Sequence, residues 1–192
     1  MQERRSNADR RAQTRQALLE TARALFAEKG FAGTGTPEVV AQAGVTRGAL
    51  YHHFADKAAL FEAVIEAEAD AIAAAIESAT EGLTGAEALW QGGRAYLRTM
   101  RDPGRLRLML VEAPAVLGPD VLRRIDADTG GRTLREGLQQ VCGGGEDADA
   151  LADLLSAMYD RAALAIGAGA DPASYEVAID RFLDRLTADR GS

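Results

Sequence analysis

The sequence of 192 residues is poor in the side chains that build covalent or metal-bound centres, with one cysteine, Cys142, and two histidines, His52 and His53. A single cysteine cannot form an intramolecular disulfide, and these three residues are too few for a zinc site of the usual Cys/His type. We therefore expect no bound metal and a protein of the reducing cytoplasm. A hydrophobic core must hold the fold, and a hydrophobic content of 47% is sufficient for one.

Long apolar runs are absent as well. No stretch of about eighteen apolar residues is present to span a bilayer. The opening segment MQERRSNADRRAQTR is charged and lacks the apolar region of a signal peptide. We expect a cytoplasmic protein that makes no contact with membranes.

The sequence also lacks the patterns that mark common catalytic and phosphate-binding sites. It contains no Gly-x-Ser-x-Gly and no His-Glu-x-x-His, and the glycine triplet 143–145 is not followed by Lys and Ser or Thr. The acidic residues after this triplet, Asp153 among them, lack the spacing of a calcium loop and are expected to cap a helix and face solvent. We predict that the protein is not an enzyme.

The net charge of −7 argues against a protein that coats nucleic acid without specificity. The charge is unevenly distributed, however. Up to Lys57 the chain carries nine Lys and Arg against six Asp and Glu, a net charge of +3, and the remainder carries thirteen against twenty-three, a net charge of −10. A locally basic segment can approach DNA while the acidic remainder opposes indiscriminate adsorption.

Patterns typical of strands are missing, and apolar residues recur at helical spacing along nearly the whole chain, which predicts an all-α fold of about nine helices. We expect a disordered basic arm over residues 1–11, followed by a helix that ends at Gly30, because glycine readily adopts the positive φ of a helix end. A long helix is predicted from about Lys57 to about Thr80, a length that suits a connector between two parts.

Caps and breakers set the boundaries beyond residue 80. Thr84 followed by Glu87 predicts a capping box at the start of the next helix. Pro114 is expected to end a brief helix, and the adjacent Gly130 and Gly131 are expected to kink or break the one that follows. Two long helices then complete the chain.

Two short predicted helices, residues 37–43 and 47–53, are separated by a turn that contains Gly44. Thr36 is the predicted N-cap of the first helix, and Thr46 is the predicted N-cap of the second. This spacing is typical of a helix-turn-helix, in which the second helix enters the major groove of DNA.

Residues from about 14 to 66, and most clearly the segment AGVTRGALYHHFADKAALF, resemble the DNA-binding head of the TetR family of transcriptional regulators. The resemblance implies a three-helix head, over residues 12–72, that a long fourth helix joins to a C-terminal bundle. That bundle, residues 73–192, is expected to dimerise and to bind a ligand. For these C-terminal residues the resemblance to the family covers the architecture only.

The resemblance also implies which residues contact DNA, and they share one short segment: Thr36, Thr46, Arg47, Gly48, Ala49, Tyr51, His52 and Lys57. Arg47 and His52 match positions that read bases, Gly48 allows close approach, and the other polar members match positions that contact phosphate. Many family members carry a β-branched or polar residue, often Thr, where this chain has Ala49. Direct readout is therefore expected to rest on Arg47, and His53 is expected to be structural.

The implied partners are a second copy of the chain, a palindromic operator in double-stranded DNA, and a small-molecule inducer. We expect a homodimeric repressor whose last two long helices form the interface, and a ligand that is largely apolar. Five apolar or aromatic residues are candidates for lining the ligand pocket, although core packing explains each of them equally well: Trp90, Tyr96, Met100, Met109 and Tyr159.

Two alternatives remain open. The first is a helical bundle that binds a ligand or a protein and does not read DNA specifically, and it is disfavoured because the polar positions of the head, such as Arg47, are retained. The second is a DNA-binding regulator that uses no ligand at all.

Overall fold

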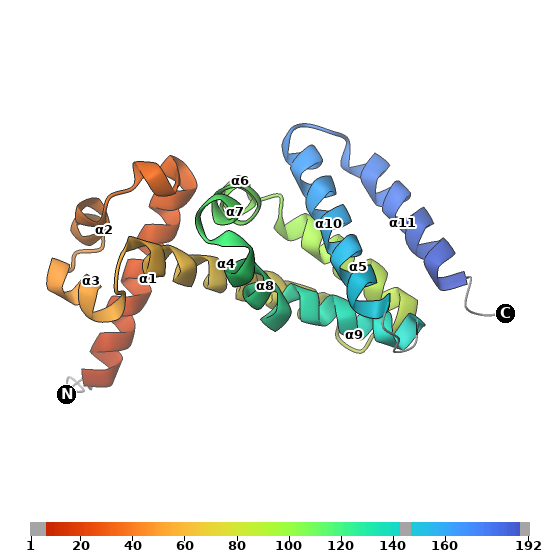
Figure 1. The fold of residues 1–192 in the computed structure, drawn as a ribbon, viewed down its shortest axis with the longest axis horizontal. Helices are drawn as coiled ribbons and strands as arrows, with labels where there is room; N and C mark the ends of the chain where they lie inside the picture. The colour runs from red at the N-terminus through yellow and green to blue at the C-terminus, as the bar shows by residue number, and fades with distance from the viewer. Residues whose placement is uncertain (1–6, 143–146, 189–192) are drawn as a thin grey trace, which may run out of the picture.

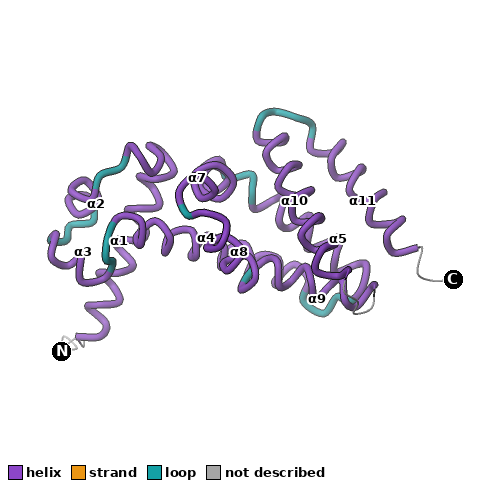
Figure 2. The backbone as a smooth tube through the Cα atoms, in the orientation of Figure 1, coloured by secondary structure: helices purple, strands orange, loops and turns teal. Residues whose placement is uncertain are grey.

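The computed structural model describes residues 7–142 and 147–188, and within these ranges the secondary structure is helical, without strands. The helices form two parts that a long helix, α4 (Lys57–Thr80), connects (Figure 1). Short loops join most of the helices (Figure 2). The predicted all-α class and the predicted bounds of α4 are confirmed. No helix in the described ranges is long and apolar enough to cross a membrane.

The first part consists of α1 (Asn7–Gly33), α2 (Thr36–Gln42), α3 (Arg47–His53) and the start of α4. The prediction of a disordered arm is wrong for residues 7–11, which are already helical in α1, and residues 1–6 lie outside the described ranges. Ala, Arg and Gln dominate the start of α1, and their high helix propensity extends the helix beyond the point where its apolar face ends. The prediction overlooked this propensity because it followed the apolar residues alone.

Gly30 interrupts α1 as predicted, with a φ of 75° and a ψ of 171°. Thr46 is confirmed as the N-cap of α3, because its hydroxyl accepts a hydrogen bond from the backbone N–H of Ala49 at 3.2 Å. The predicted N-cap of α2 is wrong by one residue. Gly35 takes that place, and its carbonyl accepts the first helical hydrogen bond, from Glu38 at 3.1 Å, so Thr36 is the first residue of the helix.

A hydrophobic core joins the three head helices to α4. Phe61 of α4 packs against Phe26 of α1 with ring centroids 5.0 Å apart, and against Phe31 at 5.1 Å. Leu50 of α3 and Val39 of α2 are fully buried in the same cluster. The two short helices are therefore held rigidly against α1 and α4.

In the second part, α5 (Gly85–Thr99), α8 (Gly118–Asp128) and α9 (Gly130–Cys142) pack against the other half of α4, and α10 (Asp147–Gly167) and α11 (Pro172–Ala188) pack against α5. The predicted break near the glycine pair is confirmed, because Thr129, with φ −128° and ψ −114°, separates α8 from α9. The predicted capping box of α5 is wrong in part. Thr84 is the N-cap but its hydroxyl caps nothing, and the Glu87 carboxylate accepts a hydrogen bond from Gln91 at 3.0 Å instead.

Residues 103–116 form three consecutive helical segments between the two parts: α6 (Pro103–Arg107), the π-helix η1 (Leu108–Glu112) and α7 (Ala113–Val116). Pro114 does not end the helix, contrary to the prediction. The wider turn of η1, in which the Ala113 N–H donates to the Leu108 carbonyl, leaves Pro114 in the first turn of α7, where a missing N–H is tolerated.

Candidate functional site

The eight predicted DNA-contact residues lie in α2, in α3 and its N-cap, and at the first residue of α4, at the end of the molecule remote from α11 (Figure 1). Arg47, Gly48 and His52 are exposed on α3, and Thr46 is exposed just before it. Ala49 is half-buried on the same helix. The predicted base-reading residues, Arg47 and His52, are therefore accessible to solvent on the surface of α3.

Thr36, Arg47 and Tyr51 converge although they come from two helices. The Arg47 guanidinium lies 5.5 Å from the centroid of the Tyr51 ring, and Tyr51 is 42% exposed. Hydrogen bonding to the Thr36 hydroxyl, and then to Arg47, lowers the pKa of the Tyr51 hydroxyl. These contacts hold the three polar groups together at the surface where α2 and α3 meet.

The two adjacent histidines differ in their surroundings. His52 is exposed, whereas His53 is half-buried beside Phe54. Burial, followed by the positive charges of His52, Arg11 and Arg15, lowers the pKa of His53. The neutral form of His53 is thus favoured, as befits a packing residue next to basic side chains.

Lys57 has a structural role that the sequence prediction did not include. Its Nζ donates hydrogen bonds to the carbonyls of Phe31 at 2.8 Å and Thr34 at 3.1 Å, and it lies 4.1 Å from the centroid of the Phe31 ring. The ammonium therefore ties the start of α4 to the end of α1. One of its three protons remains for a phosphate.

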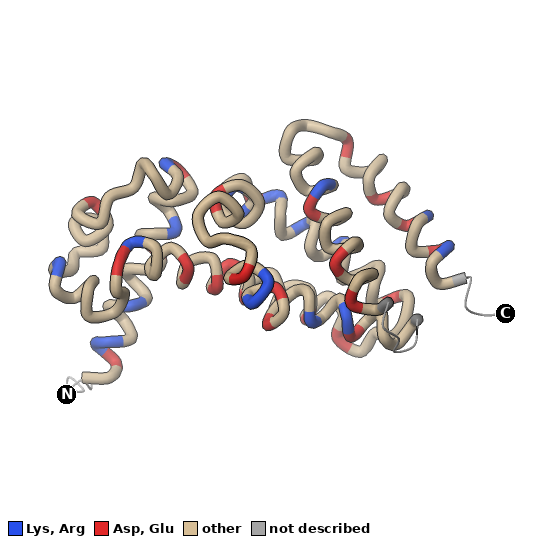
Figure 3. The backbone as a smooth tube through the Cα atoms, in the orientation of Figure 1, with Lys and Arg blue, Asp and Glu red and all other residues tan. Residues whose placement is uncertain are grey.

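Basic residues of α1 extend this surface. Figure 3 shows Lys and Arg along the N-terminal half of α1 and at α3. Arg10, Arg11 and Arg15 are exposed, and the Arg15 guanidinium lies 5.4 Å from the centroid of the Phe54 ring, next to the end of α3. The sequence analysis assigned part of this charge to a disordered arm, whereas the structure places it on a helix beside the candidate DNA-reading element.

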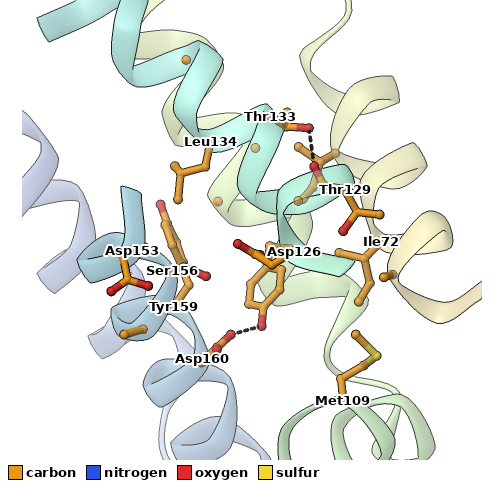
Figure 4. Close-up of a pocket in the computed structure, with 18 of the residues that line it drawn as sticks. Ile72, Met109, Asp126, Thr129, Thr133, Leu134, Asp153, Ser156, Tyr159 and Asp160 are labelled. Carbon is orange, nitrogen blue, oxygen red and sulfur yellow. Dashed lines mark hydrogen bonds between the residues drawn. The ribbon is translucent and has the colours of Figure 1, made fainter. Parts of the chain in front are cut away.

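A cavity of about 560 Å³ lies in the second part (Figure 4), between α4, α5, η1, α8, α9 and α10. Tyr96, Met109 and Tyr159 line it, as the sequence analysis expected of a pocket. Trp90 and Met100 do not line it, and that expectation is wrong. Met100 is 3% exposed within the second hydrophobic core and Trp90 packs against that core, because the face of α5 that meets the cavity is the one that carries Tyr96.

Several acidic residues at the cavity were missed by the sequence analysis. Asp126 of α8 and Asp153 and Asp160 of α10 line it (Figure 4), and Asp153 is exposed to solvent, as expected from the sequence. The Tyr96 hydroxyl donates a hydrogen bond to the Asp160 carboxylate. Burial raises the pKa of Asp160 and of Asp126 above the usual range. The seven-residue spacing of Asp153 and Asp160, which places them on one helix face, was the available signal.

Comparison with known proteins identifies the family. Residues 18–64 match the family described as bacterial regulatory proteins, tetR family, and residues 86–189 match the one described as Tetracyclin repressor-like, C-terminal domain. The chain belongs to the TetR family. It is therefore a DNA-binding transcriptional regulator with an N-terminal helix-turn-helix, and the TetR family is not a family of enzymes.

Individual relatives support this TetR assignment. The TetC protein of transposon Tn10 from Escherichia coli is 32% identical over 115 residues, which are 60% of this chain and 58% of that protein. The HTH-type transcriptional regulator AcrR of Shigella flexneri is 46% identical over 54 residues, 28% of this chain and 25% of its own length. The chain thus matches less than two thirds of either curated relative. The crystal structure of a TetR-family transcriptional regulator from Pectobacterium atrosepticum, 33% identical, superposes with a TM-score of 0.67 over 95% of both chains.

In this TetR-family regulator, ion pairs around Glu68 of α4 hold the head against the second part. The Glu68 carboxylate is buried and accepts hydrogen bonds from Arg23 of α1 and from Arg105 of α6, each at 2.7 Å. Burial alone raises the pKa of Glu68, but the two guanidinium groups outweigh it, and the pKa lies below its usual value. Glu68 therefore remains charged and joins three helices.

A second connection in the TetR-family regulator runs through η1. The Glu112 carboxylate accepts a hydrogen bond from the backbone N–H of Phe31 at 2.9 Å. Arg107 pairs with Glu112 at 3.1 Å and donates to the carbonyl of Glu28 in α1 at 2.7 Å. Met109, in the same π-helix, lines the cavity. One five-residue element therefore touches both the cavity and the end of the first head helix.

Proposed function

We propose that this regulator is a homodimeric repressor that binds a palindromic operator and is released from it by a small molecule in the cavity. The observation that carries the proposal is the position of η1, which meets the cavity through Met109 and the head through Glu112. The cavity volume of about 560 Å³ lies in the range of pockets that hold small organic ligands. Operator DNA would place the protein in the cytoplasm.

In the proposed complex α3 enters the major groove. Arg47 offers a planar pair of donors to a base edge, most naturally guanine, and Gly48 leaves room for the backbone to approach the DNA. His52 contributes a second polar contact to bases. Ala49 offers only its methyl group, so recognition rests chiefly on Arg47.

Backbone contacts position that helix. Thr36, Thr46 and Tyr51 contact phosphate groups on either side of the groove, with the Tyr51 hydroxyl oriented by its contacts to Thr36 and Arg47. Lys57 uses its remaining proton for a phosphate. These contacts fix orientation and carry no sequence information of their own.

The proposed dimer forms through α10 and α11. Large apolar side chains are exposed on these helices, with Leu154 at 67%, Val177 at 50% and Phe182 at 48% exposure. Exposed apolar side chains gathered on two adjacent helices are typical of an interface in which four helices pack across a two-fold axis. Such a dimer places two α3 helices about 34 Å apart, one turn of DNA.

Release follows if the ligand binds better to a state in which the heads no longer fit both half-sites. A ligand that displaces Met109 moves η1, and Glu112 and Arg107 transmit that movement to the end of α1. A coupling free energy of about 1–3 kcal/mol corresponds to operator binding weakened about 5- to 150-fold.

The test is selection of binding sites from random duplex DNA at one fixed, near-physiological salt concentration. Wild type and Arg98→Ala, a control at an exposed arginine of α5, should enrich the same palindrome, and Arg47→Ala should not. Failure of the wild type to enrich any sequence, with binding that simply fades as salt rises, would favour the alternative of a helical bundle that does not read DNA specifically.

A further inference from the structure

The charged residues that line the cavity are mostly acidic. Asp126, Asp153, Asp160 and Glu136 contribute four carboxyl groups, whereas Arg123 contributes one guanidinium. That guanidinium already pairs with Asp120 outside the lining. The cavity therefore has an excess of negative charge that protein groups at its wall do not balance.

Asp153 and Glu136 are exposed to solvent, and among these carboxyl groups Asp160 is the one that is poorly compensated. Within the described residues the Asp160 carboxylate has one hydrogen-bond donor, the neutral hydroxyl of Tyr96. Asp126 is better compensated, because it pairs with Arg135 at 3.8 Å, accepts a hydrogen bond from the backbone N–H of Gly131 and has a side chain that is 49% exposed. Burial, together with the negative charge of Asp126, raises the pKa of Asp160, so each charge makes the other less favourable.

Tyr159 adds an aromatic ring and a hydroxyl to the wall of the cavity. Its side chain lines the cavity and the residue is only 7% exposed, yet its hydroxyl makes no hydrogen bond to any described residue. Its ring meets the ring of Tyr96 edge to face, with centroids 6.1 Å apart. In Figure 4 the hydroxyl end of Tyr159 points toward Leu134, and Asp160 lies on the same helix at the other end of the ring. The hydroxyl is not among the buried polar atoms that lack a partner, so it keeps access to solvent and can bond to water.

Apolar side chains form the rest of the wall. Ile72 of α4 and Leu134 of α9 face the same space as the aspartates (Figure 4). A bare metal ion does not suit this combination, and the described residues contain no group of three or more His, Cys, Asp or Glu that is able to hold one. A ligand with both an apolar body and a positive charge satisfies both kinds of surface.

We infer that the cavity selects an organic cation, a protonated amine on an apolar body, whose ammonium group lies between Asp126 and Asp160, beside Tyr96. The ammonium donates to the carboxylates, and the ring of Tyr96, whose hydroxyl contacts Asp160, attracts its charge. An anionic ligand would add to the uncompensated negative charge, and a neutral one would leave it in place. This inference rests on the proposed function. The sequence predicted a largely apolar ligand, and the inference adds a positive charge to that ligand.

The test is isothermal titration of the full chain with three probes that share one apolar body: 2-naphthylmethylamine, 2-naphthylmethanol and 2-naphthoate. The amine is expected to bind about tenfold or more tightly than the alcohol, and the carboxylate most weakly. Equal binding of amine and alcohol overturns the inference and leaves the proposed ligand release standing. Absence of binding by all three also overturns it, while site selection on random DNA decides the DNA-binding proposal independently.

Substitutions of the cavity aspartates show which residues cause the preference for the amine over the alcohol. Asp126→Asn and Asp160→Asn should each lose about ten- to hundredfold in amine affinity and leave alcohol binding unchanged. Asp128→Asn, on the same helix as Asp126 but outside the cavity, should bind the amine like wild type. Thermal melting of each variant establishes that it is folded. An amine preference that survives both cavity substitutions overturns the assignment of the carboxylates.

Discussion

The Glu112 carboxylate accepts a hydrogen bond from the backbone N–H of Phe31 at 2.9 Å, across the boundary between the DNA-binding head and the rest of the protein. The contact is possible because Gly30, directly before Phe31, turns the chain with a φ of 75° and presents no side chain. A Cβ at residue 30 would lie 2.6 Å from the Glu112 Oε1 and 2.7 Å from the Arg107 guanidinium. The end of α1 and the connection to η1 thus require the same glycine.

Gly30→Ala should lower the free energy of unfolding by about 1–3 kcal/mol, because alanine is strained at positive φ and its methyl group displaces Glu112. Urea unfolding at one fixed protein concentration measures the change. Gly33→Ala is the matched control, since a Cβ there lies no closer than 3.4 Å to a neighbour and residue 33 has no positive φ. Equal effects of the two substitutions would contradict the role given to Gly30.

Lys57→Ala should destabilise the head as well as weaken DNA binding. The substitution removes two hydrogen bonds to main-chain carbonyls and the contact with the Phe31 ring, a loss of about 1–3 kcal/mol. Thermal melting measures it, with Arg47→Ala as an exposed cation whose removal should leave the melting temperature unchanged. A Lys57→Ala protein as stable as wild type would contradict the structural role of Lys57 and leave only the proposed phosphate contact.

Lys57 also illustrates how far the sequence predicts this site. The helices of the head follow from local signals, such as the N-cap at Thr46 and the glycine at position 30, and both were confirmed. Contacts between distant segments have no such signal. Nothing around Lys57 indicates that its ammonium binds carbonyls at the end of α1. Likewise, Asp126 and Asp160 come from separate helices, and only the packed bundle brings them to one cavity.

Phe182→Glu should convert the proposed dimer into a monomer. A carboxylate at this 48% exposed position of α11 would be buried without a partner in an interface formed by α10 and α11. Light scattering coupled to size exclusion reports the mass in solution. Val111→Glu, at an apolar residue of η1 that is 53% exposed and outside those helices, should leave the mass unchanged. A Phe182→Glu protein that retains the mass of a dimer would place the interface elsewhere.

Asp160→Asn should raise the free energy of unfolding at pH 8. Burial raises the pKa of Asp160 in the folded state, the hydrogen bond from Tyr96 opposes this, and the charge of Asp126 adds to it. Above that pKa the buried carboxylate is charged and destabilises the fold. As the pH falls through the folded-state pKa of Asp160, the folded state takes up a proton before the unfolded state does. The destabilisation caused by the buried charge therefore disappears. The gain in free energy of unfolding that asparagine gives should therefore vanish as the pH approaches 3.8, the usual pKa of an aspartate.

Glu68→Gln should behave in the opposite way, and the pair forms one experiment. The net effect of burial and of the guanidinium groups of Arg23 and Arg105 is a lowered pKa for Glu68. Its charge therefore contributes stability that is fully present above the usual value of 4.5 and is lost as the pH falls through the lower folded value. The substitution should cost about 1–3 kcal/mol at pH 8 and progressively less in acid. Urea unfolding from pH 8 to below pH 3.8 measures both variants. Parallel curves for Asp160→Asn and Glu68→Gln would contradict the view that the cavity carboxylate is held at a cost to stability while the carboxylate between α1 and α6 supports the fold.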